Sequence, residues 1–183
     1  MSMIYGRRVR LRALEREDVA KFYDWVNDAE VTAGLSLFLP MSTWDEEKWF
    51  ERAMQRPQES KPFAIEIRDG EVWRLIGNCS FFDLDWIAHA GEIGIMIGDK
   101  SIWEQGYGTE TVGLLLRHGF RTLNLNRISL RVYADNPRAI RAYEKAGFVL
   151  EGRMRQAVYK RGKYQDILVM SVLREEWDAG EEV

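Results

Sequence analysis

The first half of the chain changes its hydrophobic period several times. Residues 8–14 carry apolar side chains at every second position, which is typical of a strand with one buried face. Residues 18–27 instead repeat apolar side chains at three- and four-residue spacing, which predicts an amphipathic helix. Thr43 is followed three residues later by Glu46, which is the spacing of a capping box. We therefore expect a second helix that begins at Thr43 and ends near Arg56.

Three further strands are expected before the middle of the chain. They are predicted at residues 63–68, 73–82 and 92–98, where β-branched and aromatic side chains are frequent. The tetrapeptide RDGE at residues 68–71 joins the first two of them, and Asp-Gly is typical of a tight β-hairpin turn. These strands are therefore expected to be antiparallel.

The second half alternates between helices and strands. A helix is expected at residues 109–122 and a strand at residues 126–134, where isoleucine, leucine and valine occupy alternate positions. Asn136 and Pro137 have the order of an N-cap residue and a first helical residue, and Gly147 is placed to end that helix. A further helix is therefore expected between Asn136 and Gly147.

The chain is expected to close with a β-hairpin. Strands are predicted at residues 148–159 and 164–173, with KRGK as the turn, and residues 178–183 are expected to form a short charged tail. The order of elements predicts about seven strands and about four helices in a mixed α+β fold, with one βαβ-like unit in an otherwise antiparallel sheet. No repeat or linker divides residues 1–183, so a single domain is expected.

Composition narrows the class of protein. A chain of 183 residues that is 46% hydrophobic is long enough for one well-filled core. Its net charge of -3 argues against nucleic acid as a partner. No segment approaches the roughly 20 apolar residues that cross a bilayer, and the N-terminus has no secretory hydrophobic region. We therefore expect a cytoplasmic protein with no membrane partner.

The cysteine and histidines do not form a pattern of metal ligands. Cys79 is the single cysteine, and only His89 and His118 accompany it, so neither a disulfide nor a bound metal is expected. Cys79 is expected to pack inside a strand, and His118 to pack on its helix. His89 lies in a loop that could line a substrate cleft.

The segment WEQGYGTET at residues 103–111 places two glycines at the start of a helix. Glycine permits a tight turn, and free N–H groups at a helix N-terminus also bind phosphate. An ATP-binding P-loop would continue with Lys and then Ser or Thr, but here Thr109 and Glu110 follow. A dinucleotide-binding fingerprint would need Gly or Ala where Thr111 stands. The loop therefore favours neither ligand.

Two segments together resemble the cofactor motifs of the GNAT superfamily of N-acetyltransferases. Residues 103–108 resemble its Arg/Gln-x-x-Gly-x-Gly/Ala pyrophosphate motif, with Trp103 at the first position. Residues 136–148 resemble its second motif, N-x-x-A-x-x-x-Y-x-x-x-G-F; the matching residues are Asn136, Ala139, Tyr143, Gly147 and Phe148. The resemblance extends over about residues 7–177. It is strongest to the branch of ribosomal-protein alanine acetyltransferases and spermidine acetyltransferase.

This resemblance implies a fold and a cosubstrate. It implies a mostly antiparallel twisted sheet that splays between the fourth and fifth expected strands, and acetyl-CoA as the acetyl donor. The diphosphate would lie on backbone N–H groups, and the pantetheine arm would pair with a strand edge. The cofactor-binding residues so implied are Ile95, Met96, Ile97, Gln105, Gly106, Tyr107, Gly108, Thr109 and Asn136.

The resemblance also implies a direct attack of a primary amine on the thioester. Tyr143 is the candidate acid that protonates the leaving thiolate, and Glu92 is the first candidate for the base that takes a proton from the amine. Asp83 and Asp85 are alternative bases. The alternative to an enzyme is a non-catalytic module that binds acetyl-CoA, and retention of Tyr143 favours the enzyme.

The acceptor amine stays open at this point. In the resembling family the segment that matches residues 27–43 forms one wall of the acceptor site. Asp28 and Glu30 of this segment, together with Asp83 and Asp85, would attract a polyamine, but an acidic rim also suits a protein N-terminus or another small amine. Aromatic-rich strands would suit the interface of a homodimer.

Overall fold

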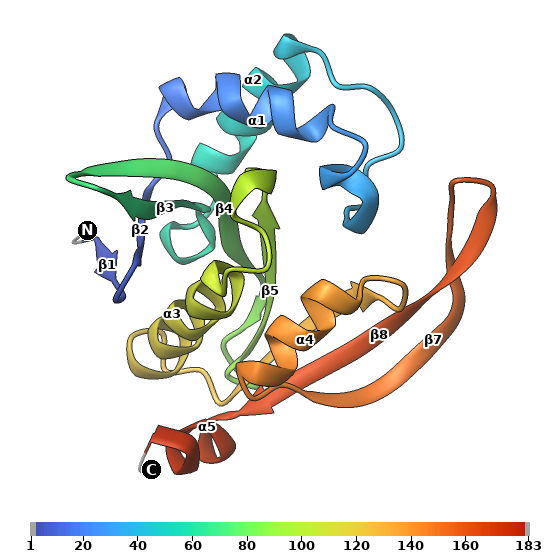
Figure 1. Cartoon of the computed structure of the whole chain (residues 1–183). Coiled ribbons are helices and arrows are strands. Elements are labelled where there is room, and N and C mark those ends of the chain that lie inside the picture. The colour runs from blue at the N-terminus through green and yellow to red at the C-terminus, as the bar shows by residue number, and fades with distance from the viewer. Residues whose placement is uncertain (1–2, 182–183) are drawn as a thin grey trace.

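A twisted eight-stranded sheet runs through residues 3–181, the part of the chain that the computed structural model describes (Figure 1). Its strands lie in the order β1-β2-β3-β4-β5-β6-β8-β7. Their bounds are β1 (Ile4–Tyr5), β2 (Val9–Ala13), β3 (Phe63–Asp69), β4 (Val72–Asp85), β5 (Ala90–Ile97), β6 (Arg127–Tyr133), β7 (Val149–Lys160) and β8 (Lys163–Leu173). Neighbouring strands are antiparallel except β5 and β6.

Helices cover both faces of the sheet (Figure 1). Within the described residues the α-helices are α1 (Val19–Val26), α2 (Thr43–Met54), α3 (Tyr107–Arg121), α4 (Pro137–Lys145) and α5 (Arg174–Glu181). On one face, α1 and α2 pack on a smaller apolar cluster that includes Ala64, Leu75 and Met96 of the sheet. On the other face, α3 and α4 pack on a larger cluster that includes Ile65 and Ile93. Alternate side chains of one strand thus enter different cores, as the period of a strand requires.

The sheet opens between β5 and β6. These two strands pair in parallel only over Ala90–Glu92 and Arg127–Ser129, and then they diverge. Beyond Glu92, β5 remains paired with β4, while β6 continues along β8. The edge of β5 that faces β6 is therefore without a strand partner from Ile93 to Ile97. This splay lies between the fourth and fifth of the expected strands, so that prediction is confirmed.

The predicted turns and caps of the second half are confirmed. Asn136 caps α4, because its side-chain oxygen accepts a hydrogen bond from the Ala139 N–H at 3.2 Å, and Pro137 is the first helical residue. Gly147 follows this helix with a φ of 97°, a left-handed conformation that favours glycine. In the last hairpin, Arg161 and Gly162 both have positive φ, as a two-residue type I′ turn requires.

Three sequence predictions are corrected by the structure. The sheet has an eighth strand because the short β1 pairs with β2. The expected tail instead contributes to a fifth helix, α5, which includes residues 178–181, and residues 182–183 lie outside the described part. The helix at the glycine loop begins at Tyr107, two residues earlier than predicted.

The predicted capping box of α2 is wrong by one position. The cap is Ser42, whose hydroxyl accepts the N–H of Asp45 at 3.1 Å, while the Asp45 carboxylate accepts the N–H of Ser42 at 2.8 Å. Ser42 with Asp45 and Thr43 with Glu46 have the same spacing, so the local pattern does not distinguish them. Tertiary packing distinguishes the two pairs: the side chain of Glu46 is buried in the fold, and Ser42 and Asp45 form the cap.

A buried ion-pair cluster joins the N-terminal helices to the sheet. The Arg12 guanidinium donates to both carboxylate oxygens of Asp18, each at 2.7 Å, and its Nε donates to Glu66 at 2.8 Å. Asp18 and Glu66 are each only 6% exposed. Removing one partner of such a cluster leaves a buried charge without compensation. Arg12 therefore neutralises Asp18 and shares Glu66 with Arg10, whose Nε donates to the second oxygen of that carboxylate at 2.5 Å.

We expect the substitution Arg12→Met to lower the free energy of unfolding by about 3–5 kcal/mol, since buried Asp18 loses its cation and Glu66 keeps only Arg10. Urea denaturation followed by circular dichroism measures this change. Arg16→Met is the matched control, because Arg16 pairs with Glu47 at an exposed site and the expected loss there is below about 1 kcal/mol. Equal midpoints for the two variants would contradict the role given to Arg12.

Candidate active site

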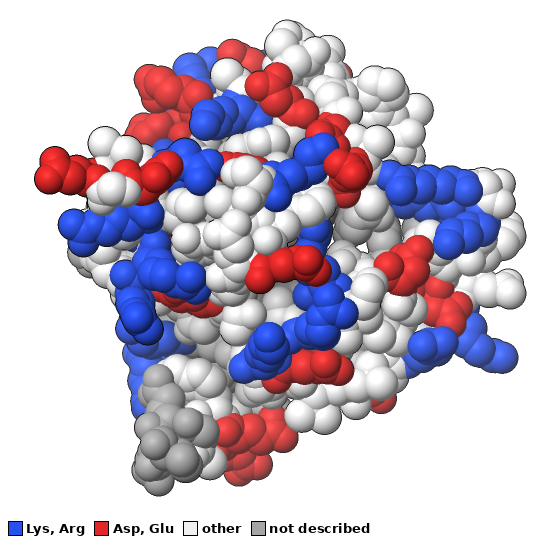
Figure 2. Space-filling view, viewed as in Figure 1, with Lys and Arg blue, Asp and Glu red and all other residues white. Residues whose placement is uncertain are grey.

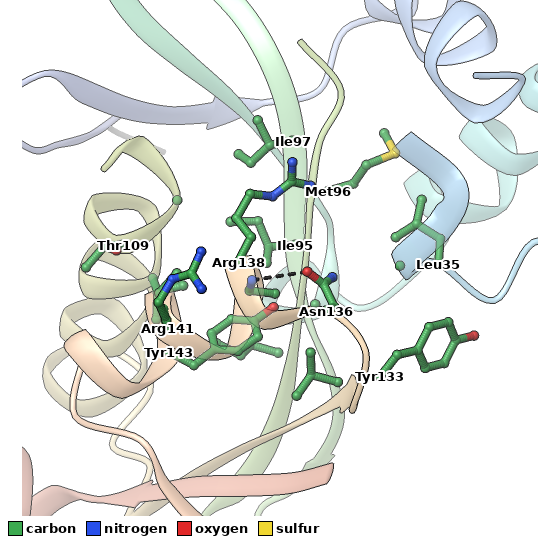
Figure 3. Close-up of a pocket in the computed structure, with 18 of the residues that line it drawn as sticks. Leu35, Ile95, Met96, Ile97, Thr109, Tyr133, Asn136, Arg138, Arg141 and Tyr143 are labelled. Atoms are coloured by element: carbon green, nitrogen blue, oxygen red, sulfur yellow. Dashed lines mark hydrogen bonds between the residues drawn. The ribbon is translucent and has the colours of Figure 1, made fainter. Parts of the chain in front are cut away.

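A cavity of about 680 Å³ lies where β5 and β6 separate. Its walls come from β5, the start of α3, the helix α4 and the short 3-10 helix η2 (Val31–Gly34) (Figure 3). Ligand sites of this size are common in enzymes. On the face of the molecule seen in Figure 2, acidic and basic side chains lie next to one another over most of the surface.

The start of α3 supplies free backbone donors to this cavity. Gly106 is the N-cap residue with a φ of 86°, a conformation that glycine adopts without strain. The first hydrogen bond of the helix runs from the Glu110 N–H to the Gly106 oxygen, so the N–H groups of residues 106–109 have no partner within the helix. A side chain added at Gly108 would meet no atom within 4 Å. Gly106 therefore makes the turn, and Gly108 keeps the space beside it open.

The acidic residue in the first turn of α3 is directed away from these donors. The carboxylate of Glu110 accepts hydrogen bonds from the Arg8 backbone N–H at 2.6 Å and from Arg8 Nε at 3.1 Å. Arg8 also donates to the Gln105 oxygen at 3.2 Å and stacks on the Tyr107 ring. The glycine loop is thus held from the β2 side, and its N–H groups remain available to an anion.

Tyr143 of α4 lies at the other end of the cavity. Its ring packs on Phe148, with 5.9 Å between centroids, and its hydroxyl points toward β5 (Figure 3). The residue is 8% exposed, and its hydroxyl makes no hydrogen bond with any described residue. Burial raises the pKa of Tyr143 to about 12. The hydroxyl therefore stays protonated at neutral pH and is available as a proton donor.

Glu92 lies in an ion pair at the point where the sheet opens. Arg131 Nε donates to both oxygens of its carboxylate, at 2.9 and 3.1 Å, and both residues line the cavity. Among the alternative bases, Asp83 is exposed and 3.9 Å from Arg131, while Asp85 accepts the N–H groups of the following turn at 2.8 and 2.9 Å. Neither aspartate lines the cavity, so of the three candidate bases Glu92 is the one that borders it.

Most of the residues implied for cofactor binding line one cavity. They are Ile95, Met96, Ile97, Gly106, Tyr107, Gly108, Thr109 and Asn136. Gln105 does not line it: its side-chain nitrogen donates to the Ser101 oxygen at 2.9 Å. Asn136 lines the cavity while its side-chain oxygen caps α4 (Figure 3). The backbone of the loop, and not the side chain of Gln105, therefore faces a ligand.

The expected acceptor wall is formed by a short part of residues 27–43. Val31, Gly34, Leu35 and Ser36 line the cavity, whereas Phe38 and Leu39 are exposed. The acidic residues of this segment do not serve it, because Asp28 and Glu30 both pair with Lys100 at 2.7 and 2.5 Å. Lys100 thus offsets part of the negative charge of this segment, while Asp83 and Asp85, which also belong to the expected acidic rim, form no ion pair with Lys100 in the described part of the chain.

The wall is anchored by a residue that the sequence analysis did not identify. Lys160, at the tip of the β7–β8 hairpin, is buried and donates to the backbone oxygens of Thr32 and Leu35. Ser36 Oγ and the Tyr133 hydroxyl are 3.1 Å apart and hydrogen-bonded. A basic residue in a hairpin turn carries no local signal for such a contact, because its partners lie more than a hundred positions away.

The remaining predictions on side chains have mixed outcomes. Cys79 is buried in β4 as expected, and burial raises the pKa of its thiol well above the ordinary value. His118 is buried between Phe63 and Phe81, and burial lowers its pKa. His89 does not line the cavity; its backbone oxygen accepts the N–H groups of residues 126 and 127.

Residues 3–181 hold neither a metal-ligand cluster nor a membrane-spanning helix. No group of His, Cys, Asp or Glu in this range has the arrangement of a metal site. No helix in it is long and apolar enough to span a membrane.

Comparison with known proteins gives consistent matches. Residues 8–149 match the family model described as acetyltransferase (GNAT) domain. The uncharacterized N-acetyltransferase p20 of Bacillus licheniformis is 28% identical over 179 residues, which cover 97% of this chain and 99% of that protein. A spermidine N(1)-acetyltransferase of Vibrio cholerae is 28% identical over 173 residues, which cover 93% of this chain and 95% of that protein.

The fold is also found in a solved structure. The crystal structure of spermidine N-acetyltransferase from Vibrio cholerae in complex with CoA and spermine has a TM-score of 0.84 and 26% identity, and the match covers 94% of this chain and 99% of that chain. The family match at residues 8–149 contains the glycine loop, Glu92 and Tyr143. The chain therefore belongs to the GNAT family of acetyltransferases and is an N-acetyltransferase.

Proposed function

We propose that the protein transfers an acetyl group from acetyl-CoA to a primary amine by direct attack on the thioester. The observation that carries this proposal is the single cavity that connects the free N–H groups of residues 106–109 with the buried hydroxyl of Tyr143. Acetyl-CoA is a long thioester with a diphosphate in its chain. The N–H groups can bind the diphosphate, and the Tyr143 hydroxyl can donate a proton at the thioester. The family match and the CoA complex of the Vibrio cholerae relative support the same cosubstrate.

Acetyl-CoA would lie along the opening between β5 and β6. Its diphosphate would accept hydrogen bonds from the N–H groups at the start of α3, where the helix dipole also favours an anion. The amides of its pantetheine arm would pair with the free edge of β5 at Ile95, Met96 and Ile97, as an added strand does. Asn136 would lie beside the same arm, since it lines the cavity opposite that edge.

Acetyl transfer would then proceed without a covalent enzyme intermediate. The neutral amine nitrogen attacks the thioester carbon, the carbon–sulfur bond breaks, and the thiolate takes a proton from Tyr143. An alkylamine is mostly protonated at pH 7, so one proton must leave before attack, through water to Glu92. The second proton of the attacking nitrogen returns to Tyr143. The products are an N-acetyl amine and CoA thiol.

The acceptor that we propose is a chemical class, the primary amines. Similarity to spermidine acetyltransferases favours spermidine or spermine, whereas Asp28 and Glu30 already share Lys100, which weakens their attraction for a polyamine. A protein N-terminus or another small amine has fewer positive charges and needs fewer carboxylates. Release of CoA thiol across a panel of spermidine, short peptides and aminoglycosides would separate these classes.

We expect Tyr143→Phe to lower kcat by about 100-fold or more, because the thiolate loses its proton donor. The dissociation constant for acetyl-CoA should stay close to the wild-type value. Thiol release measures the first quantity and isothermal titration calorimetry the second. Tyr164→Phe is the matched control, since this hydroxyl belongs to an exposed residue of β8 that does not line the cavity. Unchanged kcat in Tyr143→Phe would remove Tyr143 from the mechanism.

The raised pKa of Tyr143 predicts the alkaline side of the pH profile. The phenol is protonated below its pKa of about 12, so it remains a donor over the range in which the amine loses its proton, near pH 10. We expect kcat/KM for the acceptor to rise up to about pH 10 and then to level off. A falling limb that begins below pH 10 would show that Tyr143 does not act as the acid.

The open space at Gly108 predicts a change in affinity without a change in stability. Gly108→Leu should fold normally, because its side chain meets no protein atom within 4 Å at Cβ, but it should weaken acetyl-CoA binding by about tenfold or more as it fills the phosphate site. Gly113→Leu is the control, since Gly113 lies on the same helix with equal space and does not line the cavity. Equal affinities in both variants would show that the diphosphate lies elsewhere.

A further inference from the structure

Arg138 reaches from α4 across the mouth of the cavity. Its side chain extends along β5 toward Ile97 (Figure 3), and its guanidinium carbon lies 3.4 Å above the centroid of the Trp103 ring. The indole is itself held in place, because Trp103 Nε1 donates to the Ile97 oxygen at 3.0 Å. A stacked arginine presents its planar face to the ring and leaves its N–H edge free.

No residue of the described part of the chain accepts a hydrogen bond from that N–H edge. Arg138 makes no hydrogen bond and no ion pair with any residue in the described range 3–181, although it is half-buried and burial lowers its pKa. The next arginine of the helix differs, because Arg141 lies 3.5 Å from the Glu104 carboxylate. A guanidinium carries five N–H donors, and a partly desolvated one is stabilised by an acceptor oxygen. Arg138 is therefore the arginine of α4 that can serve a ligand.

The position of this edge indicates which part of the ligand it meets. Arg138 lines the same cavity as Gly106, Gly108 and Thr109, and the Trp103 platform comes directly before the glycine loop. Of the two acidic residues nearby, Glu110 is bound by Arg8, whereas Glu104 lines the cavity and acts on Arg138 through its charge without a hydrogen bond to it. The free donors of Arg138 and the free N–H groups of α3 thus border one volume. A phosphate is the group that a guanidinium edge and a helix start both bind well.

We propose that Arg138 determines selectivity for the diphosphate of acetyl-CoA, using Trp103 as a platform that holds the guanidinium edge toward the start of α3. This inference rests on the proposed function. It adds a charged side chain from α4 to a site that otherwise relies on backbone N–H groups. It also explains why a cation lies on an indole at the mouth of the cavity: stacking holds Arg138 in place while its N–H edge stays free for the ligand.

The test compares three acetyl donors: acetyl-CoA, acetyl-dephospho-CoA and S-acetylpantetheine. Only the first two carry the diphosphate. We expect Arg138→Met to raise KM for both of them by about 10- to 100-fold and to leave kcat/KM for S-acetylpantetheine unchanged. Arg138→Lys should restore part of the affinity, because lysine supplies the charge without the bidentate fork. Arg155→Met, an exposed arginine of β7, controls for the change in net charge and should leave all three donors unaffected.

Three results would overturn the assignment. A wild-type KM for acetyl-CoA in Arg138→Met would show that the guanidinium does not bind the donor. A loss with acetyl-CoA but not with acetyl-dephospho-CoA would place Arg138 on the 3′-phosphate instead of the diphosphate. An equal loss with S-acetylpantetheine would show a structural defect. Failure of the proposed function itself is distinct, because the wild-type protein would then neither bind nor use acetyl-CoA.

Discussion

The site depends on the early separation of β5 from β6. The two strands pair over three positions, Ala90–Glu92 with Arg127–Ser129, and each then continues with a different neighbour. Backbone groups on the free edge of β5 must be satisfied by water or by a ligand, since no strand covers them. Because α3 and α4 pack on the same face next to this opening, a helix start and a buried tyrosine border the exposed edge. One break in strand pairing thus creates the cavity and the groups that line it.

Pairing of charges decides which groups around the cavity can act on a ligand. Several ionised side chains near it are already engaged: Glu92 with Arg131, Arg141 with Glu104, Glu110 with Arg8, and Asp28 and Glu30 with Lys100. Paired charges attract a ligand less than free ones of the same type. The groups left to bind a ligand directly are backbone N–H groups, the edge of β5, the Tyr143 hydroxyl and the N–H edge of Arg138, while Glu92, beside Arg131, would take a proton only through water. Recognition would therefore depend more on geometry than on net charge.

The acceptor side is built from segments that are distant in sequence. The wall at Val31–Ser36 is held by Lys160 from the last hairpin and by Tyr133 from β6. Lys160 bonds to backbone oxygens of this segment. It therefore fixes the position of the wall and does not require particular side chains in it. If the acceptor binds at this wall as expected, the side chains of the wall, such as Leu35, would set which acceptor the cavity admits.

The sequence by itself determined those features that depend on a few neighbouring residues. The cap at Asn136, the turn at Arg161–Gly162 and the helix after Gly106 all follow from local backbone preferences, and resemblance to a family added the splay and Tyr143. Only the tertiary structure decided the pairing of Glu92 with Arg131, 39 positions apart, and of Glu30 with Lys100, 70 positions apart. It also turned Gln105 away from the cavity and stacked Arg138 on Trp103. Local patterns encode geometry over about one helical turn or one hairpin, whereas these contacts depend on strand register and helix packing across the whole sheet.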